Sequence, residues 1–301
     1  MHHHIFKETV GISKEEKVHF IDDHRHEHSL TILLKVAMLS KSSYFEYKNR
    51  IISSQEKRKI DISRSIEKIW LNSNKIYGAR KIKAMLELEG IFTSERTVGN
   101  YMKQLDIASV YRRKYRPAKS GNTRNEDLVN KAKYINIKRP HQCVATDITY
   151  IHTRQDGWVY QITFIDLYSR KVLHYGVSKK MDDDFVSSNT EQVLKKYKDI
   201  RILHSDRGSQ YTSKCYRNLL EEYSVQGSYS KPGYPYDNAI IESYHASLKI
   251  EWLYRHQFQT IEDVNKAVFK YNYGFYNTKR IHQSLGYLTP NQVEINYLEL
   301  K

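Results

Sequence analysis

Three acidic residues occupy positions from which they could act together in a chemical reaction. Asp147 lies inside the stretch VATDITYI, where β propensity disfavours an aspartate. Asp206 follows the stretch ILHS, and Glu242 lies in the first turns of a predicted helix. Each carboxylate alone is consistent with a helix cap or a strand-end hydrogen bond. All three at such positions in one fold indicate a shared site instead.

Converging carboxylates repel one another unless a cation neutralises them. A ligand set made only of oxygen suits Mg²⁺, for which Mn²⁺ can substitute. Two such ions can activate an attacking oxygen and stabilise a leaving oxygen in phosphodiester chemistry. The three acids therefore suggest a magnesium-dependent enzyme that acts on phosphodiesters.

The segments around these acids predict a mixed α/β layer. Residues 142–153 and 158–169 are rich in β-branched and aromatic residues and flank the turn signal RQDG, so they predict a hairpin. In the predicted βββαβαβα order the first and fourth strands can be neighbours, which would bring the three acids together. The remaining strands are expected at 171–178, 200–206 and 225–230, and the helices at 182–198, 213–224 and 238–254.

The charge balance of the chain points to a polyanionic partner. The 301 residues include 49 Lys and Arg against 34 Asp and Glu, a formal net charge of +15. Such an excess favours nucleic acid first and an anionic membrane surface second. No apolar run approaches the roughly 20 residues needed to span a bilayer, and the first residues lack a signal-peptide core. Two cysteines provide no disulfide framework, which favours a reducing cytoplasm.

Helical patterns fill the first third of the chain. Residues 1–60 are predicted to form short helices, either a helix-turn-helix unit or a small helical packing module. Residues 61–107 are predicted to hold a second helix-turn-helix unit that binds DNA. In that unit Thr93 or Ser94 should cap the last helix, and Gly90 should end the one before it.

A basic linker is predicted over residues 108–135, between the helical region and the α/β layer at 136–300. A run of positive charge is often only solvated surface, but here it joins two candidate nucleic-acid modules. We therefore expect it to contact the DNA backbone. The basic side chains concerned are Arg112, Arg113, Lys114, Arg116 and Lys119.

The spacing of the acids and the sequence around them resemble those of a known family. Between Asp206 and Glu242 lie 35 residues, so the acids match the D-D-(35)-E pattern of retroviral-integrase-like transposases. The stretches HSDRGSQYTS, YDNAIIESYHASLKIEW and YNTKRIHQSLGYLTP, with IYGARKIKAMLELEGI nearer the start, resemble the second-frame protein of the IS-three family of bacterial insertion sequences. The resemblance covers nearly the whole chain.

The resemblance implies an α/β, RNase H-like (retroviral-integrase-like) catalytic core preceded by an all-α helix-turn-helix region. It implies that Asp147, Asp206 and Glu242 are catalytic and bind Mg²⁺, or Mn²⁺ in its place. The implied activity is DNA cleavage and 3′-OH strand transfer at the terminal inverted repeats and into target DNA, in the bacterial cytoplasm at the nucleoid. A homo-oligomeric synaptic complex is expected, and an upstream-frame protein or frameshift fusion is a possible further partner.

Several residues near the acids carry their own expectations. Lys249 lies two helical turns after Glu242, so both face the same way, and it matches the family's terminal-DNA contact. Gln210 and Tyr211 are expected near DNA, and Gly208 is expected to permit the turn after Asp206. His245 is expected to be a packing or surface residue, and Asp166 a structural one. The basic, amphipathic segment TKRIHQSLGYLTP is expected to pack back on the core.

Two other functions remain open from the sequence. An RNase H-like or junction nuclease would use the same core for hydrolysis only. An inactive DNA-binding regulator derived from a transposase would bind DNA without cutting it. The 35-residue spacing and the helix-turn-helix patterns argue against the nuclease, and the presence of all three acids argues against the regulator.

Overall fold

The computed structural model describes residues 13–49, 53–112, 129–132, 135–231 and 238–300. The chain divides into two compact units, residues 1–62 and 63–301.

The first unit holds the three short helices that the sequence predicts. They pack around a small core that includes Val18, Ile21, Leu33 and Tyr44. Ser13 and Glu16 form a reciprocal capping box, which satisfies backbone N–H groups that the first turn leaves free. The helices are α2 (Lys14–Asp23), α3 (Leu30–Val36) and α4 (Lys41–Lys48).

Three more helices and a short 3₁₀ turn come next. The Ser94 side chain accepts a hydrogen bond from the Thr97 backbone N–H, so Ser94 is the predicted cap. Gly90 takes a φ of +77° just after the helix before it, as expected of a stop. The predicted boundary between residues 60 and 61 falls inside a continuous helix. The elements are α5 (Ser54–Asn72), α6 (Ala79–Leu88), α7 (Glu95–Gln104) and η1 (Val110–Arg112).

A five-stranded mixed sheet forms the centre of the α/β layer, as predicted. Its strand order is β3-β2-β1-β4-β5. The first three strands form an antiparallel meander, whereas β4 pairs in parallel with both β1 and β5. The strands are β1 (Cys143–Thr153), β2 (Gly157–Asp166), β3 (Val172–Ser178), β4 (Ile202–Ser205) and β5 (Gln226–Tyr229).

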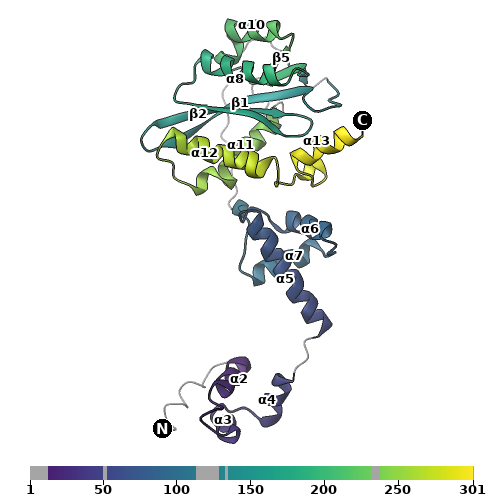
Figure 1. Ribbon diagram of the computed structural model, residues 1–301, viewed down its shortest axis with the longest axis vertical. Helices are drawn as coiled ribbons and strands as arrows, with labels where there is room; N and C mark the ends of the chain where they lie inside the picture. Colours follow the sequence, from purple (N-terminus) through teal and green to yellow (C-terminus); the bar gives the residue numbers. More distant parts are fainter. Residues whose placement is uncertain (1–12, 50–52, 113–128, 133–134, 232–237, 301) are drawn as a thin grey trace. The chain divides into compact units, whose positions relative to one another are not determined.

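Helices cover both faces of this sheet (Figure 1). On one face α8 (Asp183–Lys196) and α10 (Lys214–Glu222) close a core that contains Val144, Phe164 and Leu203. The short helix α9 (Ser209–Thr212) packs beside them. On the other face α11 (Ala239–Glu251) and α12 (Ile261–Tyr271) contact β1. The sheet is thus the middle layer of three.

The last part of the chain packs back on the core, as its sequence predicts. The Asn277 side chain brackets Val172 at the start of β3, accepting from its N–H at 3.0 Å and donating to its C=O at 2.9 Å. Gly286 has a φ of +64°, a conformation that glycine adopts without strain. The elements here are η4 (Leu253–Arg255), the π turn η5 (Asn272–Tyr276), η6 (Gln283–Leu285) and α13 (Pro290–Glu299).

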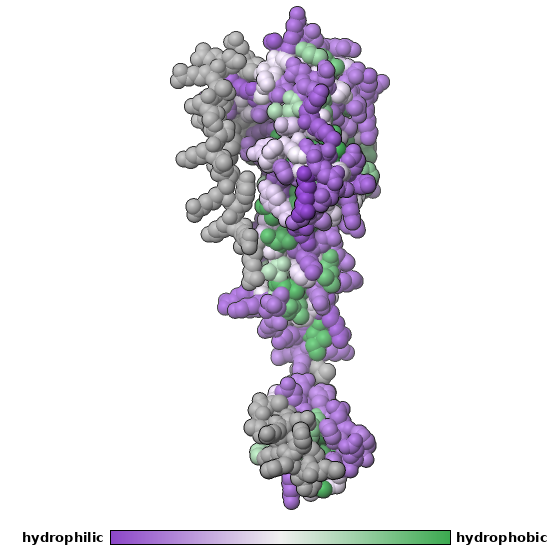
Figure 2. Space-filling model, turned by 90° about the vertical axis from the view of Figure 1, so that its left-hand side faces the viewer, coloured by the Kyte–Doolittle hydropathy of each residue, from purple (hydrophilic) through white to green (hydrophobic). Residues whose placement is uncertain are grey.

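The surface is mainly polar. On the face in Figure 2, hydrophilic residues predominate and the apolar residues form small groups. Within the described ranges, no helix is long and apolar enough to cross a membrane.

The packing around β4 gives a stability prediction. Leu203 is 1% exposed on the strand that leads to Asp206. Leu203→Ala should lower the free energy of unfolding by about 2–5 kcal/mol, because it removes buried methyl groups and leaves a cavity. Denaturant unfolding followed by tryptophan fluorescence measures this change. The same substitution at Leu298, which is 68% exposed, should cost less than about 0.5 kcal/mol. Equal losses at both positions would show that β4 is not part of the stable core.

Candidate active site

The parallel pairing of β1 with β4 sets two of the three acids side by side. Ala145 pairs with His204 in the register of these strands. Asp147 lies two residues further along β1, and Asp206 lies two residues after His204, directly past the end of β4. The two aspartates therefore stand at the same level, where β4 ends and β1 continues. This is the neighbouring of first and fourth strands that the sequence predicts.

The third acid comes from α11, which packs against β1. Glu242 lies in the first turn of this helix with its side chain exposed. One turn later, His245 is buried and its Nδ1 lies 3.2 Å from Asp147 Oδ2. Its Nε2 lies 3.3 Å from Thr163 Oγ1 on β2. The prediction of a packing residue holds for His245, but its contact with Asp147 was missed.

The carboxylates influence one another electrostatically. Desolvation by the surrounding protein and, second, the charge of Asp147 raise the pKa of Asp206. The same two causes raise the pKa of Glu242, although His245 acts in the opposite direction. Both shifts mean that these acids ionise less readily in the folded protein than they would in water. Asp147 is the charge that the other two acids share.

The donor set suits a hard divalent cation. All three acids offer only oxygen, and a cation between them would relieve the repulsion that raises their pKa values. Among the residues that the structure describes, however, no three His, Cys, Asp or Glu side chains lie close enough together to hold one metal ion. The chemistry of the acids thus fits Mg²⁺ or Mn²⁺, while their positions are not those of a closed ligand cage.

The turn after Asp206 is held differently from the prediction. The Gly208 N–H donates to Asp206 Oδ1 at 2.9 Å and fixes this carboxylate. Gly208 itself has a φ of −55°, which any residue can adopt, so the turn does not require glycine. Close packing restricts this position more than the backbone conformation does, because a Cβ added at Gly208 would lie 3.1 Å from Asp206 Oδ1 and 3.3 Å from Gln210 Oε1. Gly208 therefore keeps the surroundings of the aspartate open.

Lys249 faces the same region from α11. Its Nζ lies 5.0 Å from the ring centroid of Tyr150 on β1, within cation–π range. Burial lowers the pKa of Lys249, and the charge of Asp147 opposes that shift. The lysine is therefore electrostatically coupled to Asp147. Its predicted contact with terminal DNA stays a prediction.

The two residues predicted beside DNA after Asp206 have different surroundings. Tyr211 is 2% exposed within the core, and its hydroxyl lies 3.2 Å from Thr146 Oγ1. The prediction of a DNA contact is therefore wrong for Tyr211, because apolar packing takes up the ring. Gln210 is partly exposed and its Nε2 donates to the Met181 C=O at 3.2 Å.

Of the remaining predicted residues, Asp166 has a structural role, and most of the basic residues of the linker lie outside the described ranges. Asp166 is buried and accepts from the N–H and hydroxyl of Ser169 at 2.8 and 2.7 Å and from the His141 N–H at 3.0 Å. It is the structural residue that the sequence predicts. Arg112 ends η1. Arg113, Lys114, Arg116 and Lys119 lie outside the described residues.

Comparison with known proteins gives both matching domain models and similar transposases. Two integrase core domain models match residues 137–235 and 223–290, and an HTH-like domain model matches residues 56–115. A transposase for insertion sequence element IS904 from Lactococcus lactis is 32% identical over 247 residues, which cover 80% of this chain and 96% of the relative. Transposase InsF for insertion sequence IS3A from Escherichia coli is 30% identical over 282 residues, covering 91% and 97%.

Solved structures with a similar chain course include retroviral integrase cores. The catalytic core domain of BIV integrase matches with a TM-score of 0.41 and 20% identity, over 53% of this chain and 97% of that one. The HTLV-2 integrase catalytic core domain in complex with magnesium matches with a TM-score of 0.41 and 15% identity, over 52% and 97%.

An integrase core preceded by an HTH-like segment defines a class of enzymes, the polynucleotidyl transferases that act on DNA, with an RNase H-like fold. The extent and identity of the sequence matches give the family within that class. The chain belongs to the IS-three family of insertion-sequence transposases.

The shared charge of Asp147 gives a prediction for the metal-free protein. Asp147→Asn should lower the pKa values of Asp206 and Glu242, because it removes the like charge that helps to raise both. A carboxyl-detected NMR titration in the presence of a chelator measures the two values. Asp156→Asn is the matched control, since Asp156 pairs with Lys179 at 2.7 Å instead. Unchanged pKa values in Asp147→Asn would mean that the acids do not interact.

Proposed function

We propose that this chain cuts one DNA strand at each end of its insertion sequence and joins the freed 3′-OH to a second phosphodiester, using Mg²⁺ or Mn²⁺ held by Asp147, Asp206 and Glu242. The observation that carries this proposal is the parallel pairing of β1 with β4 beside α11, which brings Asp147 near Asp206 and near the helix that bears Glu242. The raised pKa values of Asp206 and Glu242 agree with it. Acids that disfavour one another's ionisation are suited to share a divalent cation.

Each residue has a distinct part in the proposed reaction. The three carboxylates bind the cations, which when bound would activate the attacking oxygen and stabilise the leaving one. His245 holds the Asp147 carboxylate from the side of α11. The Gly208 N–H holds Asp206. Lys249 pairs with a phosphate of the terminal strand, because its ammonium group lies beside the acids without an ion-pair partner among the described carboxylates.

The proposed chemistry has two phosphoryl-transfer steps, a hydrolysis and then a transesterification, without a protein–DNA bond. Water attacks a terminal phosphodiester, the bond from phosphorus to the 3′ oxygen breaks, and that oxygen takes a proton to become a 3′-OH. This 3′-OH then attacks a second phosphodiester, whose own 3′ oxygen leaves and is protonated. In the first strand transfer, the 3′-OH of one element end is joined to the other end, which gives a circular intermediate. This circle later integrates into target DNA.

The rest of the chain is proposed to hold the DNA. Residues 61–107 bind the terminal inverted repeats, helped by the helical region 1–60. Residues 108–135, with Arg112, Arg113, Lys114 and Arg116, contact the DNA backbone, and Gln210 lies near it. The net charge of +15 supports this role.

The assembly follows from the substrate. Two element ends must be paired with a target, so we propose a homo-oligomer in a synaptic complex, acting on nucleoid DNA in the bacterial cytoplasm. An upstream-frame protein or a frameshift fusion is a further proposed partner. The catalytic core corresponds to residues 136–300.

The central test removes one proposed ligand. Asp206→Asn should reduce both cleavage and strand transfer by more than about 100-fold, since even residues that only support metal ligands are worth about 10–100-fold. Binding of a duplex that carries the terminal inverted repeat should be nearly unchanged. Gel assays with Mg²⁺ and a labelled duplex measure cleavage, and a duplex with a pre-cut 3′-OH end measures joining.

The matched control for this test is Asp199→Asn, at a side chain that is 73% exposed. It should retain wild-type cleavage and joining. Strand transfer retained by Asp206→Asn would refute the assigned site. A wild-type chain that hydrolyses DNA but never joins a pre-cut 3′-OH end would instead be a nuclease.

A further inference from the structure

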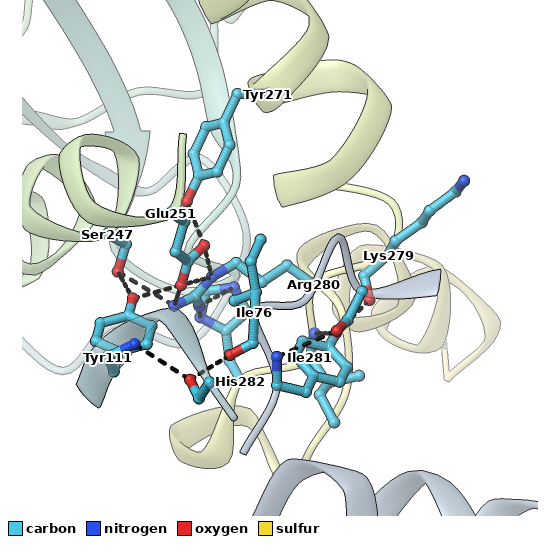
Figure 3. A network of polar contacts seen from close by, with 12 residues as sticks. Ile76, Tyr111, Ser247, Glu251, Tyr271, Lys279, Arg280, Ile281 and His282 are labelled. Atoms are coloured by element: carbon cyan, nitrogen blue, oxygen red, sulfur yellow. Dashed lines mark hydrogen bonds and ion pairs between the residues drawn. The ribbon is translucent and has the colours of Figure 1, made fainter. Parts of the chain in front are cut away.

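A buried ion pair lies at the opposite end of α11 from Glu242. Glu251, the last residue of this helix, is 0% exposed and pairs with Arg280 (Figure 3). Arg280 Nε lies 2.8 Å from Oε2 and 3.0 Å from Oε1 of Glu251, and Nη2 lies 2.6 Å from Oε1. The proposed reaction does not use this pair.

Neighbouring groups complete the hydrogen bonds of the pair. The Tyr271 hydroxyl on α12 donates to Glu251 Oε2 at 2.8 Å, and Arg280 Nη2 donates to Ser247 Oγ at 3.1 Å. Burial alone would raise the pKa of Glu251, but the Arg280 charge lowers it overall. The carboxylate is therefore ionised and paired, a state that is costly to disturb by removing one partner.

One donor to this carboxylate comes from the segment that matches the HTH-like domain. The hydroxyl of Tyr111, in η1, donates to Glu251 Oε1. It reaches the same carboxylate as Tyr271, but from a position 140 residues earlier in the chain. Tyr111 thus joins the HTH-like segment to a charge that belongs to the catalytic core.

Three further contacts join the same parts of the chain. The Tyr77 hydroxyl, just before α6, donates to the Lys279 C=O at 2.9 Å and accepts from the Ile281 N–H at 3.0 Å, on both sides of Arg280. Arg255 Nη1 donates to the Asn74 C=O at 2.8 Å. All three contacts are directional hydrogen bonds, which fix orientation as well as proximity.

The ion pair and these contacts together define a docking node, made of Tyr77, Tyr111, Glu251 and Arg280. One member of the node, Glu251, lies on the same helix as Glu242, α11. Glu251 follows Glu242 by nine residues, which corresponds to about 14 Å along α11. A segment attached at the node is therefore held at a set distance from the acids.

We propose that the docking node fixes the HTH-like segment on the catalytic core, so that the distance between the DNA sequence it binds and the cleaved phosphodiester is constant. Tyr77 and Tyr111 are positioning residues in this proposal, and neither touches the reacting atoms. The inference rests on the proposed function, since it concerns where the same site cuts. A buried ion pair often stabilises a fold no more than apolar residues of the same size would. We therefore assign this pair a role in orientation rather than in stability alone.

The test compares two tyrosines that donate to the same carboxylate. Tyr111→Phe removes the donor from the HTH-like segment, and Tyr271→Phe removes the donor from within the core. The full chain is given a labelled duplex that carries the terminal inverted repeat of its own insertion sequence, and the cut is mapped to the nucleotide. Tyr111→Phe should spread cleavage over neighbouring phosphodiesters, whereas Tyr271→Phe should keep the wild-type bond. Tyr77→Phe should behave as Tyr111→Phe.

A second measurement does not depend on activity. The Ile281 amide, which donates to Tyr77, reports undocking through its hydrogen exchange. In Tyr111→Phe its exchange should be faster by roughly tenfold or more, as expected for loss of a hydrogen bond to a charged acceptor. In Tyr271→Phe it should change much less.

The outcomes separate this inference from the function on which it rests. If Tyr111→Phe and Tyr271→Phe cut at the same bond, or show equal Ile281 exchange, the docking node does not position the segment. If the wild-type chain cuts no DNA, the proposed function fails, and the exchange comparison alone then decides whether the segment is docked.

Discussion

The parallel pairing of β1 with β4 is the constraint on which the catalytic region depends. Strand β4 is only four residues long, and its register with β1 places Ala145 opposite His204. One step of register in either direction would turn every following side chain to the other face of the sheet. Asp147 and Asp206 can influence one another only in the observed register. The buried residues around Leu203 hold that register, so core packing and chemistry are linked at this strand.

Helix α11 carries a carboxylate near each end, and the two carboxylates have opposite electrostatic surroundings. Near its start, Glu242 is exposed and experiences the like charge of Asp147, which leaves the region ready for a cation. At its end, Glu251 is buried and already neutralised by Arg280. The like charges at the first end do not neutralise one another, whereas the carboxylate at the second end has a guanidinium partner and a further hydroxyl donor.

Local patterns made much of this fold predictable. The β-branched runs around RQDG gave the hairpin, Ser94 gave the cap of α7, and the order of strands gave the neighbours β1 and β4. The three acids could be singled out as candidates because Asp147 conflicts with β propensity, Asp206 follows a strand and Glu242 lies near the start of a helix. Family resemblance then supplied their roles.

Residues whose environment depends on distant segments could not be found in this way. Tyr211 looks like an exposed residue in a polar stretch, yet α9 packs against α8 and α10 and its tyrosine is buried in the core cluster beside Tyr216. The contact of His245 with Asp147 and the pairing of Glu251 with Arg280 each join positions far apart in the sequence. The spacing of His245 three residues after Glu242 was the only local signal, and Glu251 had none.

The Tyr77 and Tyr111 hydroxyls also bear on how such proteins diversify. An element that acquires new terminal repeats needs a new DNA-reading segment, and the simplest source is a segment exchanged from a relative. An incoming segment would have to present a hydroxyl group to the Lys279 C=O and the Ile281 N–H, as Tyr77 does, or it would remove a hydrogen-bond partner from these backbone groups of the core. The few atoms at this junction would then restrict which segments can be exchanged, independently of the DNA sequence that a segment binds.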